Sequence, residues 1–165
     1  AFPTGRLVHR LDRDTSGVMV FALTAHAQRH LGQQFETRKT RKTYIARVAG
    51  RREPKTGSVD LPLIVDWPNR PLQKVCHETG KPALTEYKVT KASDAESRVR
   101  LHPLTGRSHQ LRVHMLALGH PIIGDPLYAP ETAAEYPRMM LHAEELRLHH
   151  PESGIGVKFR AKAPF

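Results

Sequence analysis

The stretch ALTEYKVTKASDAESRVRLHPL, residues 83–104, decides how the centre of this chain folds. Apolar and polar side chains alternate on both sides of the polar segment 92–96, and Val99 and Leu101 point to the same face. Two alternating stretches separated by a short polar turn are typical of an antiparallel strand pair. We therefore expect residues 83–104 to form the centre of a β-sheet.

Further strands are predicted on both sides of this pair. KTYIARVAG (42–50) alternates in the same way, and SVDLPLI (58–64) is a short strand that Pro62 places near a sheet edge. SGVMVFAL (16–23) has the composition of a buried strand, and the last quarter holds two more candidates, at 138–150 and 155–163. VDWPNRPLQKV (65–75) contains two prolines and is predicted to be an extended surface loop.

Two segments have the pattern of helices. In AHAQRHLGQQFETR (25–38), Ala27, Leu31 and Phe35 recur at helical spacing after Thr24, a suitable N-cap. SHQLRVHMLALG (108–119) begins with Ser108 as a possible cap and ends at a glycine. Strands interrupted by two or three helices indicate an α+β fold with a largely antiparallel sheet.

Composition limits the kind of protein. The 165 residues suit one domain, and the formal net charge of +10 favours an anionic partner, foremost nucleic acid. Residues 38–55 hold eight of the cations and a single acid, Glu53, which is typical of phosphate contact. No apolar run approaches the roughly 20 residues of a membrane helix. Cys76 is the only cysteine, which excludes an internal disulfide and favours a reducing, cytoplasmic setting.

HRLDRDTSG (9–17) places two acids in a turn ahead of a strand. Asp12 and Asp14 are candidates for paired acid–base catalysis. The alternative is that one of them caps the turn and pairs with Arg10 or Arg13. Local spacing leaves both interpretations open.

TGRSHQLRVH (105–114) places Arg107 beside the start of the expected helix. A cation there opposes the helix dipole, so a carboxylate or phosphate partner is expected nearby, and Asp12 is a good candidate. The alternative is an arginine that extends into solvent. Tyr44 lies on a strand within the basic region and is a candidate for stacking on an unpaired base, or else a half-buried strand residue.

Other chemistries have weak support. His109 and His114 are five residues apart, which puts them on different helix faces, and the eleven histidines show no metal-binding spacing. The phosphate-binding glycine loops of nucleotide-dependent enzymes are absent from the sequence. Ser16 and Ser108 lie outside any G-x-S-x-G motif, so a serine triad is not indicated.

HRLDRDTSG, RKTYIARV (41–48) and residues 105–128, taken in this order, resemble the RluA family of pseudouridine synthases. MLHAEEL (140–146) and FRAKAPF (159–165) extend the resemblance over essentially the whole chain. It implies a pseudouridine synthase fold, with a mixed, largely antiparallel, bent sheet flanked by a few helices and loops. It also implies a catalytic domain spanning 1–165 from which the family's N-terminal segment is missing.

The resemblance assigns roles to individual residues. Asp12 is implied to be the catalytic aspartate, Arg107 its partner and Tyr44 the residue that packs on the target uracil. Arg10 would enter the RNA loop, and Leu141 would pack near the base. Asp14 lies at a position that the family does not require, so the resemblance leaves it a turn or surface role. Other cations are expected to bind RNA, namely Lys42, Arg41, Arg38 and Arg112.

The resemblance implies an RNA-uridine isomerase that uses no metal and no other cofactor. The closeness of residues 60–87 to one branch of the family implies two substrates, a hairpin of the large-subunit rRNA and a tRNA anticodon stem-loop. We expect a cytoplasmic monomer. The alternatives are an inactive RNA-binding module of the same fold and, with little support, a metal-dependent nuclease.

Overall fold

The antiparallel pair expected at residues 83–104 forms the centre of the molecule. In the computed structural model, which describes residues 4–165, β8 (Leu84–Ala92) and β9 (Glu96–Pro103) pair with Tyr87 opposite Leu101. Residues 1–3, which belong to the expected domain, lie outside the described residues. The prediction of this strand pair is confirmed.

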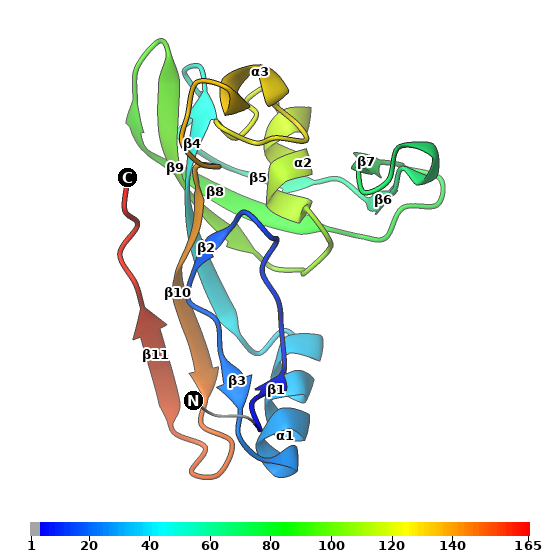
Figure 1. Ribbon diagram of the computed structural model, residues 1–165, viewed down its shortest axis with the longest axis vertical. Helices are drawn as coiled ribbons and strands as arrows, with labels where there is room; N and C mark the ends of the chain where they lie inside the picture. The colour runs from blue at the N-terminus through cyan, green and yellow to red at the C-terminus, as the bar shows by residue number, and fades with distance from the viewer. Residues whose placement is uncertain (1–3) are drawn as a thin grey trace.

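A long sheet is built outward from this pair (Figure 1). Its neighbours along the sheet are all antiparallel, which confirms the predicted α+β class. The order is β11 (Gly156–Arg160), β10 (Leu141–His149), β4 (Arg41–Ala49), β9, β8 and β5 (Thr56–Asp60). The single strand predicted at 58–64 is divided: β5 is an edge strand, as predicted for this segment, but Leu63 and Ile64 belong to a separate sheet.

The two longer helices cover one face of this sheet and leave a gap between them (Figure 1). α1 (Ala25–Glu36) begins where the Thr24 hydroxyl accepts a hydrogen bond from the Ala27 amide at 3.1 Å, as expected of an N-cap. Its Leu31 and Phe35 pack with Leu146 of β10. The prediction of this helix and of its buried side is confirmed.

α2 (Gln110–Ala117) covers the other end of the same face. Leu111 and Met115 pack into the main core with Val99 and Leu101 of β9. The chain leaves the helix through Gly119, whose φ of +78° suits glycine. A short helix, α3 (Pro130–Ala133), follows.

The segment 16–23 is not the single buried strand that its composition predicts. It contains β2 (Ser16–Gly17), which pairs in parallel with β10, and β3 (Phe21–Ala22), which pairs with β1 (Arg6–Leu7). Gly17 has a φ of +125°, which is incompatible with continuous strand geometry. The chain therefore turns after β2, and Phe21 is exposed.

Residues 65–75 are more regular than the predicted loop. β6 (Leu63–Val65) and β7 (Gln73–Val75) form a separate hairpin, closed by the 3₁₀ turn Trp67–Asn69. The hairpin projects from the body beside α2 (Figure 1) and is tied to it where the Gln73 amide donates to the Tyr128 hydroxyl at 2.8 Å. Within residues 4–165, no helix is both long and apolar enough to cross a membrane.

Candidate active site

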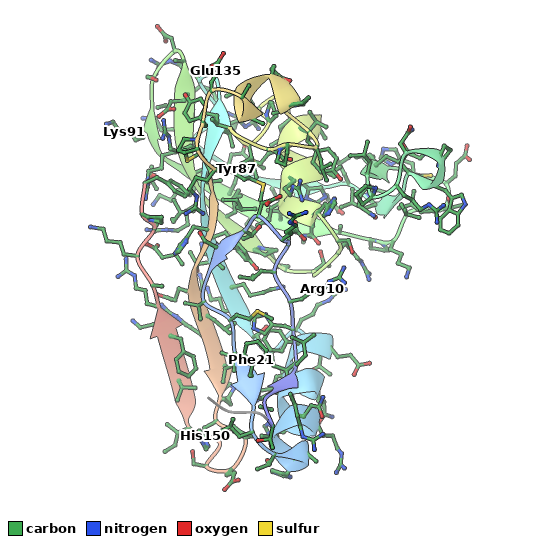
Figure 2. The ribbon with its side chains drawn as sticks, in the orientation of Figure 1. Arg10, Phe21, Tyr87, Lys91, Glu135 and His150 are labelled. Carbon is green, nitrogen blue, oxygen red and sulfur yellow. The ribbon has the colours of Figure 1, made fainter. Side chains whose placement is uncertain are left out.

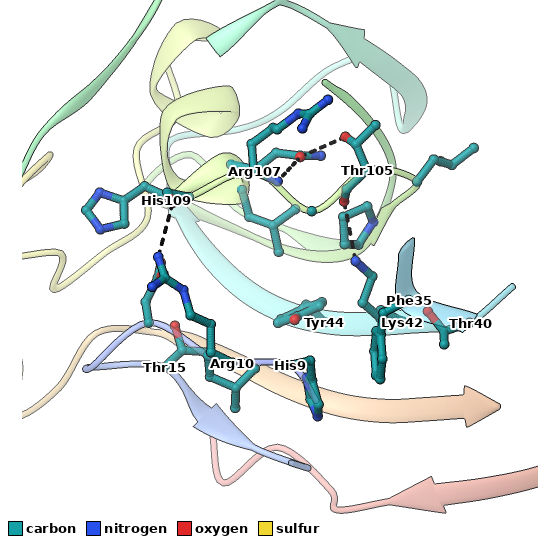
Figure 3. Close-up of a pocket in the computed structure, with 18 of the residues that line it drawn as sticks. His9, Arg10, Thr15, Phe35, Thr40, Lys42, Tyr44, Thr105, Arg107 and His109 are labelled. Carbon is teal, nitrogen blue, oxygen red and sulfur yellow. Dashed lines mark hydrogen bonds between the residues drawn. The ribbon is translucent and has the colours of Figure 1, made fainter. Parts of the chain in front are cut away.

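A pocket of about 570 Å³ opens on the helix-covered side of the sheet. It lies between the N-terminal loop (residues 8–15), β4 and the segment that leads into α2 (residues 103–109). Figure 3 shows Tyr44 of β4 between Arg10 of the loop and Arg107 of the α2 segment. Asp12 also lines the pocket, so the structure brings together the three segments that carry the family resemblance.

The loop that carries Asp12 is held against the sheet by a close backbone contact. The Thr15 amide donates to the Asp12 carbonyl oxygen at 3.0 Å, which closes a turn. Gly17 then pairs with Ala143 of β10, and a Cβ at Gly17 would overlap the Ala143 backbone. Glycine is therefore required here. Asp12 keeps a side-chain exposure of 23%, whereas Asp14 is exposed and lies outside the pocket lining.

Tyr44 is aligned with this loop through the same residue of β10. Ala143 is the register partner of both Gly17 and Tyr44, so β10 sets the position of the loop relative to β4. Burial of the phenol and the nearby charge of Asp12 raise the pKa of Tyr44 to about 12. The Tyr44 hydroxyl therefore remains protonated at neutral pH.

Asp12 pairs with Arg112, and the prediction that Arg107 is its partner is wrong. Arg112 Nη1 lies 3.4 Å from Asp12 Oδ2. Arg112 Nε and Nη2 each donate to an oxygen of Asp125 at 2.7 Å. Burial acts to lower the pKa of Arg112, but Asp125 and Asp12 raise it overall, so one cation serves two carboxylates.

The expectation that Arg112 binds the RNA backbone is also wrong. Its side chain is 3% exposed and its guanidinium is occupied by two carboxylates inside the protein. The ring of Tyr128 also lies 5.0 Å from the guanidinium carbon. Arg112 thus belongs to the structure that holds Asp12.

The reason for the changed pairing is that α2 begins later than predicted. His109 adopts a left-handed conformation, with φ 53° and ψ 20°, so Ser108 is not the N-cap. The N-cap is His109, which makes no side-chain hydrogen bond to the helix, and the segment before the helix is bound instead by the side chain of Gln110. Its Oε1 accepts from the Arg107 amide at 3.0 Å and from the Thr105 hydroxyl at 2.7 Å.

Arg107 consequently precedes the helix by three residues and lies at the edge of the pocket. Its Nε donates to the Pro82 carbonyl oxygen at 3.0 Å. Arg112 lies in the first turn of α2, where its side chain reaches Asp12. The two arginines of this segment therefore have different environments, one at the rim and one buried.

The remaining polar residues of this segment form a buried hydrogen-bond chain. Gln110 Nε2 donates to Thr85 Oγ1 at 3.0 Å, and Thr85 Oγ1 lies 2.9 Å from His114 Nδ1. His114 Nε2 lies 3.0 Å from the Leu61 carbonyl oxygen. That oxygen only accepts, so the proton of neutral His114 is assigned to Nε2 and the Thr85 hydroxyl donates to Nδ1. Burial lowers the pKa of His114, in agreement with this neutral form.

The cations predicted to bind RNA fall into two groups. Arg38 and Lys42 line the pocket, and Arg10 Nη2 donates to Ser108 Oγ at 3.2 Å at its rim. Burial lowers the pKa of Lys42, whose Nζ lies 3.4 Å from the Thr105 carbonyl oxygen. Arg41 points to the other face of the sheet, because neighbouring residues of a strand alternate, and it is not part of this pocket.

The apolar wall of the pocket includes Leu141 and Phe35. Leu141 is only 2% exposed and lies at the start of β10. His9 stacks on Phe35 with ring centroids 4.6 Å apart, and its Nε2 accepts from the Val20 amide at 2.9 Å. Burial, followed by the charge of Lys42, lowers the pKa of His9, so this face of the pocket carries a neutral imidazole.

Sequence reasoning missed Asp125. A signal was present in the sequence. Arg112 lies on a helix that is predicted to be partly buried, and Asp125 is the only acid between Glu96 and Glu131. A buried arginine requires an acidic partner. Within residues 4–165, no group of three or more His, Cys, Asp or Glu side chains is arranged to hold a metal ion.

The fold and this pocket define a class of enzyme that comparisons with known proteins identify. The profile of the family described as RNA pseudouridylate synthase matches residues 3–117. The chain belongs to this family, and it is therefore an isomerase.

The chain is also similar to individual bacterial proteins that have been named. The chain is 60% identical over 166 residues to the dual-specificity RNA pseudouridine synthase RluA of Escherichia coli K12, covering 99% of this chain and 76% of that protein. It is 58% identical to the RluA protein of Yersinia pestis, covering 99% of this chain and 81% of that protein.

Solved structures show the same fold. Human RNA pseudouridylate synthase domain containing 1 superposes with a TM-score of 0.86 at 34% identity, covering 99% of this chain and 71% of the human chain. Human RNA pseudouridylate synthase domain containing 4 gives a TM-score of 0.80 at 28% identity, covering 97% of this chain and 72% of that chain. The predicted pseudouridine synthase fold is confirmed.

Proposed function

We propose that this isomerase converts specific uridines to pseudouridine in two kinds of stem-loop, one in the large-subunit rRNA and one in the tRNA anticodon arm. The proposal is supported by 60% identity to an Escherichia coli enzyme whose name states dual specificity. We further propose that it acts as a monomer in the cytoplasm, where both RNAs occur, and that the described residues form one catalytic domain.

The observation that carries the proposed mechanism is the pairing of Asp12 with Arg112 beside Tyr44. Pseudouridine formation breaks the bond between N1 of uracil and C1′ of ribose and joins C5 to C1′. C5 loses a proton and N1 gains one, so the reaction is balanced without an oxidant or an energy source. It needs a group that acts at the ribose while the free base turns.

Asp12 is the proposed group. As a carboxylate it attacks C1′ as a nucleophile, or it removes a proton from C2′ to give a glycal; both routes begin from the ionised form. Arg112 fixes the orientation of the carboxylate through the contact at 3.4 Å. Because Arg112 is itself held by Asp125, the direction of this contact is set before RNA binds.

Tyr44 and Leu141 are proposed to hold the detached uracil. The Tyr44 ring offers a flat surface beside Asp12, and Leu141 closes the apolar wall. A base that is free in the site for part of the reaction needs such contacts, since its escape would leave an abasic RNA. The protonated Tyr44 hydroxyl adds no charge that would repel the Asp12 carboxylate.

The target base must leave the stack before it reaches Asp12, which costs a few kcal/mol. Arg10 lies at the pocket rim and is exposed, so it is suited to enter the RNA loop and take the place of the base. Arg38, Lys42 and Arg107 surround the same opening and are proposed to contact phosphates.

The test compares two neighbouring aspartates. We expect Asp12→Asn to abolish pseudouridine formation in a uridine-containing stem-loop, measured by primer extension after carbodiimide treatment. Asp14→Asn is the matched control, because Asp14 is exposed outside the pocket, and we expect it to retain activity. Activity that survives Asp12→Asn would overturn the mechanism, and absence of activity in the unmodified protein would favour an inactive RNA-binding module.

A further inference from the structure

The face of the sheet opposite the pocket is strongly basic. Directly opposed residues in an antiparallel ladder lie on the same face. Tyr44, Leu101 and Tyr87 are opposed and face the core beneath the helices. The next row therefore faces the other way, and it consists of Ile45, Arg100 and Lys88, which are opposed on β4, β9 and β8.

Cations oppose one another in three rows of this face. Arg100 is opposite Lys88, and after a bulge in β8, Arg98 is opposite Lys91. The third row crosses three strands, with Arg147 of β10 opposite both Arg41 of β4 and Lys158 of β11. Like charges directly opposite each other on a sheet are unfavourable. Three such rows on one face thus indicate that the face meets an anion.

Acids on the same face do not balance these cations. Glu145 is bound to Arg147 at 2.6 Å. Burial acts to raise the pKa of Glu145, but its hydrogen bond to Arg147 and the charges of Lys158 and Arg160 lower it overall. Glu86 and Glu96 also face this way, and Glu96 is bound to Arg47 at 2.6 Å, but the cations on this face still outnumber the acids. Five of the cations are exposed, namely Arg41, Lys88, Lys91, Arg147 and Lys158.

The row on β4, β10 and β11 surrounds a hollow of about 340 Å³. Lys39, Arg41, Arg147 and Lys158 line it. Its lining shares no residue with the lining of the catalytic pocket. Figure 2 shows the two sides of the molecule, with Lys91 on the left of the view and Arg10 of the pocket on the right.

We propose that this basic face, defined by Arg41, Lys88, Lys91, Arg100, Arg147 and Lys158, binds the phosphate backbone of RNA segments that flank the target stem-loop. The proposal rests on the proposed function, in which the substrate is a structured RNA. Protein interfaces have an apolar centre that is depleted in charge. The basic face has the opposite composition. The exposed Phe159 of β11 does not belong to it, because Phe159 is opposite Leu146 and therefore lies on the face that α1 covers.

The experiment compares two RNAs and two double variants. One RNA is the target stem-loop alone, and the other is a longer transcript that contains the same stem-loop with flanking duplex. Lys88→Gln/Lys158→Gln removes two charges from the basic face, and Arg6→Gln/Arg29→Gln removes two from the exposed N-terminal segment and α1. Dissociation constants are measured over a range of KCl concentrations, and single-turnover rates are measured on the short stem-loop.

We expect Lys88→Gln/Lys158→Gln to weaken binding of the long transcript by roughly tenfold and to reduce its salt slope by about 2, since each lost phosphate contact lowers the slope by about 0.9. Binding and turnover of the short stem-loop should not change. The Arg6/Arg29 control should leave the preference for the long transcript intact. The melting temperature should stay the same or rise, because opposed like charges are removed.

Several results would overturn the proposal. One is equal binding of both RNAs by the unmodified protein, and another is an unchanged salt slope in Lys88→Gln/Lys158→Gln. A third is a lower melting temperature of this variant, which would show that the two lysines stabilise the fold. If an acidic protein occupies the face instead, the long transcript will bind the variant as tightly as it binds the unmodified chain. Failure of the proposed function is seen separately, as absence of pseudouridine in the short stem-loop.

Discussion

Arg112 is held by Asp125 through two hydrogen bonds of 2.7 Å and approaches Asp12 through one contact of 3.4 Å. Asp125 is fully buried, whereas the Asp12 side chain is 23% exposed. The buried carboxylate therefore fixes the arginine, and the partly exposed one keeps an oxygen available to the substrate. This unequal sharing distinguishes Asp125, a structural acid, from Asp12, the acid that we propose reacts with the ribose.

We expect Asp125→Ala to destabilise the protein much more than Asp12→Ala. Loss of one partner of a buried ion pair costs about 3–5 kcal/mol. Loss of a partly exposed partner at longer distance should cost less than about 1 kcal/mol. Urea unfolding measures both free energies. Equal losses in the two variants would contradict the assignment of Asp125 as the anchor of Arg112.

The two arginines of the α2 segment should differ in kinetics. Arg112→Lys loses the planar guanidinium that reaches both carboxylates, and we expect kcat to fall by roughly 100-fold or more. Arg107→Lys keeps a cation at the rim, and we expect kcat to stay within about threefold while KM rises. Steady-state kinetics on one stem-loop make the comparison. If Arg107→Lys has the larger effect on kcat, the pairing seen in the structure is not the one used in the reaction.

Gly17→Ala should impair both stability and activity. The added methyl group would overlap the Ala143 backbone, and φ of +125° strains any L-residue, so we expect a loss of about 1–3 kcal/mol. The loop that carries Asp12 would move, and kcat should fall with it. Gly32→Ala in α1 is the control, because its methyl group meets open space and should stabilise the helix by roughly 0.5–1 kcal/mol. Thermal unfolding and turnover are measured for each variant.

Acidification should destabilise the fold through its buried and half-buried histidines. Burial lowers the pKa of His9, His102, His109 and His114 below the ordinary value of 6.5. As pH falls below about 6.5, the unfolded chain binds more protons than the folded one, so the free energy of unfolding decreases. Melting temperatures measured between about pH 7.5 and pH 5.5 should therefore fall.

His114 allows this pH dependence to be assigned. His114→Gln removes one buried titrating group and should make the decline in melting temperature less steep, although the variant starts from lower stability. His150→Gln, at an exposed position, is the control and should leave the slope unchanged. An identical slope in all three proteins would show that His114 does not contribute to acid sensitivity.

Much of the sheet and α1 could be predicted because their side chains repeat with clear periods. The alternation in residues 84–103 and the Thr24 cap both correspond directly to local geometry. Composition was misleading at residues 16–23, where Gly17 meets Ala143, a residue far away in the sequence. A contact between distant segments leaves no periodic signal in the segment itself.

The partner of Asp12 could not be predicted for a similar reason. The choice between Arg107 and Arg112 depends on where α2 begins, and the left-handed His109 and the side chain of Gln110 set that point. Helix ends are the least certain part of a prediction from sequence. The N-cap lies at His109 rather than at Ser108, and Arg112, in the first turn of α2, is the arginine that reaches Asp12.

Ala143 pairs with Gly17 on one side and with Tyr44 on the other. During synthesis on the ribosome, Asp12 and Tyr44 emerge about a hundred residues before the strand that aligns them. We therefore expect nascent chains that stop short of β10 to lack a working site, whatever helices and hairpins they have already formed. On this expectation, catalytic competence requires that β10 has been synthesised.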